Sequence, residues 1–462
     1  MKDRFEVKIN GKTVLAPAGT VLSDILDIEK PCGGRGTCGK CKVRVNGSDK
    51  LACRYIIDSD IEVETCEKSD IVSESGISES GTLTDNLCYA LDIGTTTLAL
   101  ALVSLDEKRT VKVTTATNPQ RVYGADVITR IDYCGRHSVK ALQKVLVNEI
   151  NKMIADLGAE VDLMYVSANV TMLHTLFGVD CTSIGVAPYN AAFLESRRVA
   201  ADAIGLHGAK SVISLPSVHS FVGADIVAGL GLVGLPEEGK YDLLVDLGTN
   251  AEIVLYSNGS GVATAAAAGP CFEGANISCG MSATEGAVYS YRSDYGQVSY
   301  QTIADAKAVG ICGTGLIDIV AELMKTGIID ETGYMDEDCG IADGVYLSPD
   351  DVRQYQLAKS AVCSAILSLM KTEGVTFDSI SKMYISGGFS GKINIPNAVS
   401  TGLLPRELAS KTVALNNSSL QGTVKYALER NDLDKLTAMI KYVDLSSNAY
   451  FTELFVENMM FE

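Results

Sequence analysis

Hydrophobic and polar positions follow a pattern that predicts a small β-rich unit followed by a larger α/β unit. The segments FEVKING and KTVLAPAGTVLSDIL, at positions 5–26, alternate with period two and then lose the alternation. That change of period predicts a β-hairpin followed by a helix. CKVRVNG and LACRYIIDSDIEVET then predict a strand and a closing extended stretch. Residues 1–66 are therefore expected to form one compact domain.

A change in composition separates this unit from the rest of the chain. Residues 67–87 include EKSDIVSESGISESGTLTDN, which is rich in serine and acidic residues and has no aromatic side chain. Such a segment cannot bury much apolar surface, so it predicts a flexible acidic linker. The domain that follows, residues 88–462, mixes apolar strands with amphipathic helices such as SVKALQKVLVNEINKMIADLG.

Two stretches of the larger domain repeat one design. CYALDIGTTTLALALVSL begins at Cys88, and YDLLVDLGTNAEIVLYSNG begins at Tyr241. Each consists of an apolar strand, an aspartate, a Gly/Thr turn and a second apolar strand. The repeat predicts two similar halves, each a sheet with helices, the second beginning near residue 241.

Composition limits the kinds of function that are plausible. A chain of 462 residues exceeds the usual size of a single core, in agreement with several domains. A net charge of -18 argues against broad contact with nucleic acid, which needs a basic face, and favours a small molecule or a protein as partner. The N-terminus lacks an apolar leader, and no run reaches the roughly eighteen apolar residues that span a bilayer. We therefore expect a cytoplasmic protein without membrane contact.

Four cysteines form the candidate metal site. Cys32, Cys38, Cys41 and Cys53 have the spacing C-x5-C-x2-C-x11-C. Three thiolates from one loop and a fourth from a distant position are how plant-type ferredoxins hold a 2Fe-2S cluster. Structural zinc usually takes its thiolates as two short-spaced pairs, so zinc is the less favoured alternative. The glycines of PCGGRGTCGK let the backbone wrap closely around a cluster.

The two Gly/Thr turns form the candidate nucleotide site. Asp92 and Asp246 each stand just before a turn whose amides and hydroxyls can hold phosphate oxygens. The turn residues are Gly94, Thr95, Thr96, Thr97, Gly248, Thr249 and Asn250. An aspartate at such a strand end can hold Mg²⁺ directly or through water. One turn of this kind is common in hairpins, but two copies in corresponding halves favour a function.

Three further features are candidates for the same site. In MYISGGFSGKIN, Gly387 and Gly388 follow an apolar strand and permit close approach of the backbone to a nucleotide. ICGTGLID is another glycine turn that either assists the nucleotide or simply opens a helix; its turn residues are Gly313, Thr314 and Gly315. Glu252 follows the second turn and either orients water or metal as a catalytic residue or belongs to a strand face.

Asp225 lies in the segment GADIVAGL, at a predicted helix start. Short polar side chains are favoured at the first position of a helix, because their oxygens accept backbone N–H groups there. We therefore interpret Asp225 as a helix cap.

In this order, the two turns and the diglycine resemble the phosphate-1, phosphate-2 and adenosine motifs of the acetate and sugar kinase, DnaK-type chaperone and actin (ASKHA) superfamily. The resemblance spans residues 88–462 and implies a two-lobed α/β ATPase domain that closes over Mg-ATP. It implies that Asp92 and Asp246 organise the metal and that Gly387 and Gly388 contact adenosine. Residues 1–66 resemble the α+β ferredoxin-like β-grasp domains of oxidoreductases.

An iron–sulfur domain joined to such an ATPase resembles the reductive activators of corrinoid proteins. The segments that carry this resemblance are SANVTMLHTLFG, VGADIVAGL, LVDLGTNAEIVL, AAAAGPCFEGANISCGM, GICGTGLID, YQLAKSAV and ISGGFS. The resemblance implies an ATP-dependent enzyme with a 2Fe-2S cluster and Mg²⁺, which reduces cob(II)alamin to cob(I)alamin on a corrinoid protein of a methyltransferase system. It also suggests a homodimer and leaves the upstream electron donor unidentified.

The chain departs from this family pattern in one respect. Members typically have a middle domain between the linker and the ATPase domain, whereas here the linker runs almost directly into LDIGTTT. The sequence therefore predicts a short form that lacks the middle domain. Three other interpretations remain open: an electron donor to another low-potential metalloenzyme, a redox-sensing nucleotide switch without electron transfer, and a small-molecule kinase with an accessory ferredoxin domain.

Overall fold

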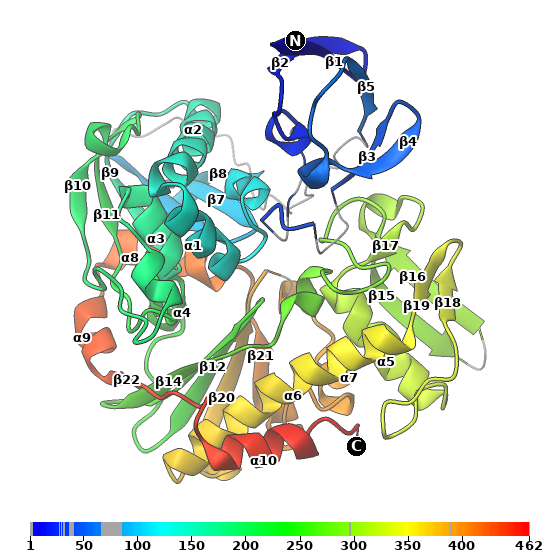
Figure 1. Cartoon of the computed structure of the whole chain (residues 1–462). Coiled ribbons are helices and arrows are strands. Elements are labelled where there is room, and N and C mark those ends of the chain that lie inside the picture. The colour runs from blue at the N-terminus through cyan, green and yellow to red at the C-terminus, as the bar shows by residue number, and fades with distance from the viewer. Residues whose placement is uncertain are drawn as a thin grey trace.

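The chain folds into an N-terminal domain and two α/β lobes (Figure 1). The computed structural model describes residues 3–26, 28, 30, 33–36, 41–65, 86–294, 297–388 and 390–461. Most of the predicted linker, together with Cys32 and Cys38, lies outside the described residues. None of the described helices is long and apolar enough to cross a membrane.

The N-terminal domain, residues 3–65, is a five-stranded sheet in the order β2-β1-β5-β3-β4. Its strands are β1 Arg4–Ile9, β2 Lys12–Pro17, β3 Lys42–Val45, β4 Ser48–Leu51 and β5 Ile61–Glu64. The predicted hairpin is β1–β2, and β5 runs parallel to β1. In place of the predicted helix, the described residues form a single 3-10 turn at Leu22–Asp24. The segment is too short to stabilise several helical turns by itself.

The first lobe, residues 86–234, has a six-stranded sheet in the order β10-β11-β9-β6-β7-β8. Its strands are β6 Leu87–Ile93, β7 Thr97–Ser104, β8 Arg109–Thr117, β9 Val161–Ala168, β10 Arg198–Ala200 and β11 Ala209–Ser214. Its helices are α1 Val127–Arg136, α2 Val139–Leu157, α3 Val170–Phe177 and α4 Ala224–Val233.

The second lobe, residues 241–461, has a six-stranded sheet in the order β21-β20-β12-β13-β14-β22. Its strands are β12 Tyr241–Leu247, β13 Ala251–Ser257, β14 Gly261–Ala266, β20 Ile380–Ser386, β21 Thr412–Ala414 and β22 Ile440–Tyr442. Smaller sheets contain β15 Ala287–Asp294, β16 Gln297–Thr302, β17 Gly310–Ile311, β18 Cys339–Ala342 and β19 Val345–Leu347. The helices are α5 Gly313–Lys325, α6 Pro349–Thr372, α7 Ile395–Ser400, α8 Ser418–Glu429, α9 Leu433–Ala438 and α10 Ala449–Glu457.

The two large sheets share their central arrangement. In each lobe three strands form an antiparallel meander, β6–β7–β8 or β12–β13–β14. Two parallel strands then extend the sheet on the side of the first strand, β9 and β11 in one lobe and β20 and β21 in the other. The first strands are apolar and buried, as is typical of strands covered on both faces. Strands β6 and β12 therefore occupy equivalent places in their sheets, and each is followed by a hairpin turn.

Helix α8 joins the lobes, because it starts in the second lobe and packs on the first (Figure 1). Its partner is α4, and the two helices touch at Gly422, where any side chain would collide with the carbonyl oxygen of Ala228. The N-terminal domain lies over the junction of the two lobes in the same view (Figure 1). The start of α8 and the two hairpin turns consequently lie close together between the lobes.

Candidate functional site

The turn between β6 and β7 is tight and is fixed by two asparagines. The Gly94 amide donates to the Thr97 carbonyl over 3.0 Å, and a Cβ on Gly94 would lie 2.7 Å from that oxygen. Asn118 Nδ2 donates to the Gly94 carbonyl over 2.8 Å. Asn169 Nδ2 donates to Thr95 Oγ1 over 3.2 Å. The glycine is thus required by the turn itself, and the turn is held in one position from behind.

A buried arginine also holds the first turn. Arg130 in α1 has no exposed surface, and its Nη2 donates to the Thr95 carbonyl over 2.6 Å. Burial lowers the pKa of Arg130 to about 10, although Asp126 and Glu273 oppose that shift. The group therefore remains a cation at neutral pH, directly behind the first turn.

The turn between β12 and β13 is braced by an acidic side chain instead. The Gly248 amide donates to the Asn250 carbonyl over 2.9 Å. Thr249 donates twice to Glu273, from its amide over 3.2 Å and from its hydroxyl over 2.6 Å. Burial raises the pKa of the Glu273 carboxyl, while these hydrogen bonds lower it.

The start of helix α8 connects the two predicted metal aspartates, which come from different lobes. Ser419 Oγ donates to Asp92 Oδ1 over 2.7 Å. Ser386 Oγ donates to Asp246 Oδ2 over 2.7 Å and is hydrogen bonded to the hydroxyl of Ser418. Two consecutive serines therefore link both strand ends to one helix, and a shift between the lobes must alter this contact.

Four carboxyl groups form an acidic cluster between the turns: Asp92, Asp225, Asp246 and Glu252. Burial and the charge of Asp246 raise the pKa of Asp92 to about 6, against hydrogen bonds from Ser419 and Asn417. Burial, Asp246 and Asp92 raise the pKa of Asp225 to about 7. Glu252 pairs with Asp246 across the β12–β13 hairpin, and its pKa is raised by burial and by Asp246.

The acidic cluster fits a hydrated divalent cation. Among the residues that the structure describes, no three His, Cys, Asp or Glu side chains are placed to hold a metal ion together. Mg²⁺ usually takes only one or two protein carboxylates and keeps several waters. Burial is the main cause of these raised pKa values, and the smaller part that comes from neighbouring carboxylates is relieved when a cation binds nearby.

Two of the four loop cysteines are described, and they converge. Cys41 and Cys53 are both buried, and their Sγ atoms lie 3.2 Å apart. Gly33, Gly34 and Gly36 have positive φ angles of 61°, 80° and 74°, so the loop curves tightly beside them. Convergent thiols in a curved glycine loop fit a thiolate-bound cluster. Cys32 and Cys38 lie outside the described residues.

Comparison with known families assigns most of the chain. The RACo middle region matches residues 87–238, and the C-terminal domain of RACo, the ASKHA domain, matches residues 240–462. The chain belongs to the RACo family. The two matches coincide with the first and second lobes, so the second lobe is the ASKHA-type C-terminal domain of this family.

Curated relatives and a solved structure agree with this assignment. The corrinoid activation enzyme RamQ of Eubacterium limosum is 27% identical over 422 residues, covering 80% of this chain and 70% of its own length. The [Co(II) methylated amine-specific corrinoid protein] reductase of Methanosarcina barkeri is 26% identical over 392 residues, covering 77% and 72%. The structure of a reductive activator for corrinoid, iron–sulfur protein aligns over 99% of this chain and 98% of its own chain, with a TM-score of 0.74 and 25% identity.

The prediction that the chain lacks a middle domain is wrong, because the RACo middle region is present at residues 87–238. This region carries the same strand, aspartate and Gly/Thr turn as the C-terminal domain, as the two sheets show. Because the two patterns are alike, the sequence alone predicts that this region is the first half of the ATPase domain and does not distinguish it as a separate middle region.

The remaining predicted residues differ in how closely they approach the turns of this RACo chain. Gly387 has a φ of 117°, and any side chain there would collide with the Leu247 carbonyl, so the diglycine lies beside the second turn. Gly313 and Gly315 instead press against the backbone of Phe272 and Val288 at the start of α5. That packing alone accounts for the two glycines, and a nucleotide role for Gly313, Thr314 and Gly315 stays a prediction.

Several site residues were not recognised in the sequence. Asp225 is not the N-cap of α4, which is Gly223, but its carboxylate does accept the Ile226 amide in the first turn over 2.9 Å, and it also belongs to the acidic cluster. Arg130, Glu273 and Ser419 were not singled out at all. Glu273 follows an apolar and glycine-rich stretch, whereas Arg130 and Ser419 lie among other polar residues and carry no local signal.

Proposed function

We propose that this chain is an ATP-dependent reductive activator of corrinoid proteins. In the proposed reaction one electron from a low-potential donor protein passes through the N-terminal domain to the cobalt of a partner, so that cob(II)alamin becomes cob(I)alamin. ATP is hydrolysed to ADP and phosphate in the same cycle. The relatives RamQ and the Methanosarcina barkeri reductase support this choice, since both are named for corrinoid activation or reduction.

The observation that carries the proposal is that one chain contains both a site with converging thiols and a candidate nucleotide site. The thiols of Cys41 and Cys53 converge in the N-terminal domain, and Asp92 and Asp246 converge on the start of α8. A nucleotide site alone would support a kinase, and a thiol site alone would support a ferredoxin. Together they support an electron transfer that depends on ATP.

The N-terminal domain is proposed to be ferredoxin-like, with Cys32, Cys38, Cys41 and Cys53 as the four ligands of a 2Fe-2S cluster. The order β2-β1-β5-β3-β4, with β1 and β5 parallel, supports a β-grasp sheet. When bound, a plant-type cluster supplies one electron at about -400 mV. Burial of Cys41 and Cys53 keeps water from their sulfur atoms, and the glycine turns leave room for backbone amides to approach them.

Between the lobes, the chain is proposed to bind Mg-ATP. The amides and hydroxyls of Gly94–Thr97 and Gly248–Asn250 would hold phosphate oxygens, and Asp92 and Asp246 would hold Mg²⁺ through water. Glu252 is placed opposite Asp246, where it could orient the attacking water. Closure of the two lobes changes the contact between α8 and both aspartates, which gives ATP a means of altering the conformation of the chain.

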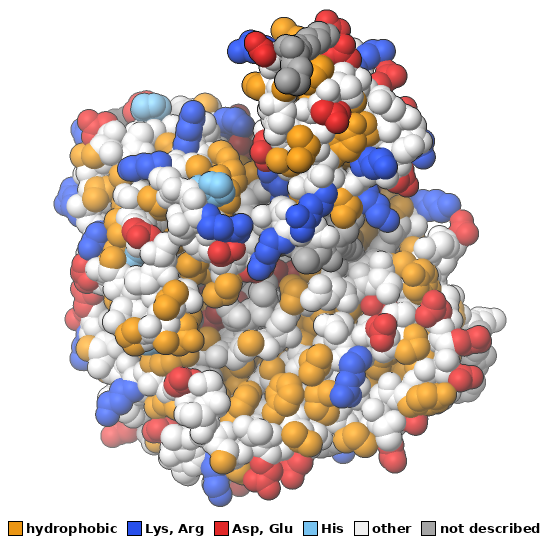
Figure 2. Space-filling model, viewed as in Figure 1, with side chains coloured by type: hydrophobic (Ala, Val, Ile, Leu, Met, Phe, Trp, Pro, Cys, Tyr) orange, Lys and Arg blue, Asp and Glu red, His pale blue; other side chains and the backbone are white. Residues whose placement is uncertain are grey.

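We also propose that the partner is a corrinoid protein of a methyltransferase system and that the chain acts as a homodimer. The surface supports a protein partner: although the net charge is -18, Figure 2 shows Lys and Arg side chains gathered where the N-terminal domain meets the lobes. Such a local basic area would attract an acidic face of a partner to this part of the surface.

The test is an anaerobic spectroscopic assay with the full-length, cluster-loaded protein. It is reduced with Ti(III) citrate, mixed with a corrinoid protein in the cob(II) state, and followed in the visible spectrum with and without Mg-ATP. Cob(I) should form only with ATP. Cys53→Ser should abolish the reaction, whereas Cys339→Ser, the same change at a half-buried cysteine of β18, should leave it intact.

Two results would count against the proposal. Formation of cob(I) at the same rate without nucleotide would remove the role of ATP. Hydrolysis of ATP by the loaded protein with several corrinoid proteins all remaining cob(II) would show that the electron acceptor belongs to another class.

A further inference from the structure

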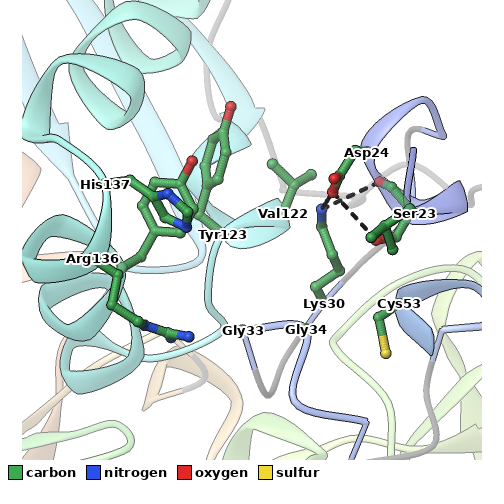
Figure 3. A pocket seen from close by; sticks show the side chains of 12 residues that line it. Ser23, Asp24, Lys30, Gly33, Gly34, Cys53, Val122, Tyr123, Arg136 and His137 are labelled. Atoms are coloured by element: carbon green, nitrogen blue, oxygen red, sulfur yellow. Dashed lines mark hydrogen bonds and ion pairs between the residues drawn. The ribbon is translucent and has the colours of Figure 1, made fainter. Parts of the chain in front are cut away.

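The described part of the cysteine loop contacts helix α1 of the first lobe. A Cβ on Gly33 would lie 2.8 Å from the Thr129 methyl carbon and 3.6 Å from the Tyr123 carbonyl oxygen. The loop backbone therefore lies directly against the first turn of α1. Beside this contact is a cavity of about 180 Å³, lined by residues of both domains (Figure 3). Cys53 and Gly34 line one side of it, and Arg136 and His137 line the other.

Thr129 is fixed to the start of its helix. Asp126 is the N-cap of α1 and accepts the Thr129 amide over 2.7 Å and the Thr129 hydroxyl over 2.8 Å. These bonds leave the methyl group of Thr129 as the part that faces Gly33. A displacement of α1 must therefore displace the surface on which the loop rests.

The next residue, Arg130, connects the same helix to the first phosphate turn. Its Nη2 donates to the Thr95 carbonyl over 2.6 Å, and its Nε donates to the Gly124 carbonyl over 2.8 Å. Gly124 in turn packs on Thr129, since a Cβ there would lie 2.8 Å from the Thr129 Cβ. Because the guanidinium is fully buried, losing either acceptor would leave a charged donor unpaired, which is costly. The turn, Arg130 and Thr129 are therefore constrained to move together.

We infer that α1 couples the phosphate turn at Thr95 to the cysteine loop at Gly33, with Arg130 and Thr129 as positioning residues at its two contacts. The inference rests on the proposed function and adds the route by which nucleotide reaches the iron–sulfur loop. A phosphate held by Gly94–Thr97 alters the position of Thr95, and Arg130 transmits this change to α1. The Thr129 methyl group then moves, and with it the surface that the loop contacts at Gly33. Such coupling acts equally in the reverse direction, so the state of the loop alters nucleotide affinity.

Hydrogen–deuterium exchange of the oxidised, cluster-loaded full chain tests this inference. Exchange is measured in peptides that cover residues 28–54, with and without a non-hydrolysable Mg-ATP analogue, while calorimetry measures analogue binding. In the wild type the analogue should change the exchange rates by about fivefold, the usual scale of allosteric coupling. Thr129→Ser keeps the hydroxyl on Asp126 and removes only the methyl, so it should lose most of that change.

Thr129→Val is the matched control, because it keeps the methyl and removes the hydroxyl. It should retain the response of the loop even if α1 is less stable. The inference is overturned if Thr129→Ser responds like the wild type, or if the wild-type loop does not respond although the analogue binds. It is also overturned if the analogue does not bind to the wild type, and in that case calorimetry shows that the proposed nucleotide site has failed as well.

Discussion

The two Gly/Thr turns share one backbone design and differ in the side chains that brace them. In the first lobe the braces are donors, namely Asn118, Asn169 and the Arg130 guanidinium. In the second lobe the brace is an acceptor, Glu273, whose carboxylate accepts hydrogen bonds from the amide and the hydroxyl of Thr249. The side chains that brace the first turn are therefore donors, one of them a cation, whereas the side chain that braces the second turn is an acceptor.

This difference suggests a division of labour within a symmetrical fold. The phosphates of ATP are anionic, so the turn with donors behind it is better suited to hold them. The turn beside Glu273, Asp246 and Glu252 is better suited to a cation and its waters. Equivalent strand order thus does not mean equivalent chemistry, and substitutions at matching positions can separate the two roles.

The largest effect is expected from the two aspartates that stand before the turns. Asp92→Asn and Asp246→Asn should each lower the rate of ATP hydrolysis by about a hundredfold or more, because each removes a charge that is proposed to organise the metal. Phosphate release at saturating Mg-ATP measures this. Asp242→Asn is the control, since Asp242 lies in the same strand as Asp246 but accepts from the Lys382 amide. Full activity in either test variant would confine the metal to the other lobe.

Substitutions of the charged residues behind the two turns should change the affinity for the Mg-ATP analogue in opposite directions. Arg130→Met should weaken binding of the Mg-ATP analogue by about tenfold, because it removes a charge-assisted donor behind the first turn. Glu273→Gln should strengthen binding by about threefold, because it removes a negative charge near the phosphates. Calorimetry measures both, and a thermal melt establishes that Arg130→Met is folded.

Arg130→Lys sharpens this comparison, because it keeps the charge and loses the planar fork. It should weaken binding less than Arg130→Met does. If Arg130→Met and Glu273→Gln shift the affinity in the same direction, the turns are not distinguished by charge, and the proposed division of labour fails.

Sequence reasoning could predict the features that depend on neighbouring residues. The two strand–turn–strand units and the long helices follow from hydrophobic period, and helix α2 at Val139–Leu157 fills its predicted segment. The converging Cys41 and Cys53 belong to a set recognised by spacing alone. The predicted N-terminal helix failed because a short amphipathic run does not show whether tertiary packing will extend it beyond one turn.

Features that depend on distant contacts could not be predicted. Ser419 contacts Asp92 across 327 positions of sequence, and Arg130 contacts Thr95 across 35. Nothing near these residues distinguishes them from an ordinary helix start or an ordinary helix arginine. The middle region was overlooked for the opposite reason, because its local pattern is the same as that of the C-terminal domain.

The acidic cluster between the turns should make metal-dependent binding sensitive to pH. The pKa values of Asp92 and Asp225 are raised to about 6 and about 7, so both groups gain protons as the pH falls through that range. A cation competes with these protons, and affinity for the Mg-ATP analogue should fall by about tenfold between pH 8 and pH 6. Asp225→Asn should flatten this profile. An affinity that does not change over this range would place the cation away from the cluster.

The smallest effect is on thermal stability. Removing a carboxylate from the acidic cluster should stabilise the fold, although it impairs function. A raised carboxyl pKa means that ionisation costs the folded state free energy, and the cost grows as the pH rises from the ordinary value of 3.8 to about 7. Asp225→Asn removes this charge while its side-chain oxygen still accepts the Ile226 amide. The variant should therefore melt about 2–4 °C above the wild type at pH 8, with the difference shrinking toward pH 4. If Asp225→Asn melts below the wild type at pH 8, the ionised Asp225 carboxylate is stabilised by its surroundings. The acidic cluster between the two turns would then not destabilise the fold.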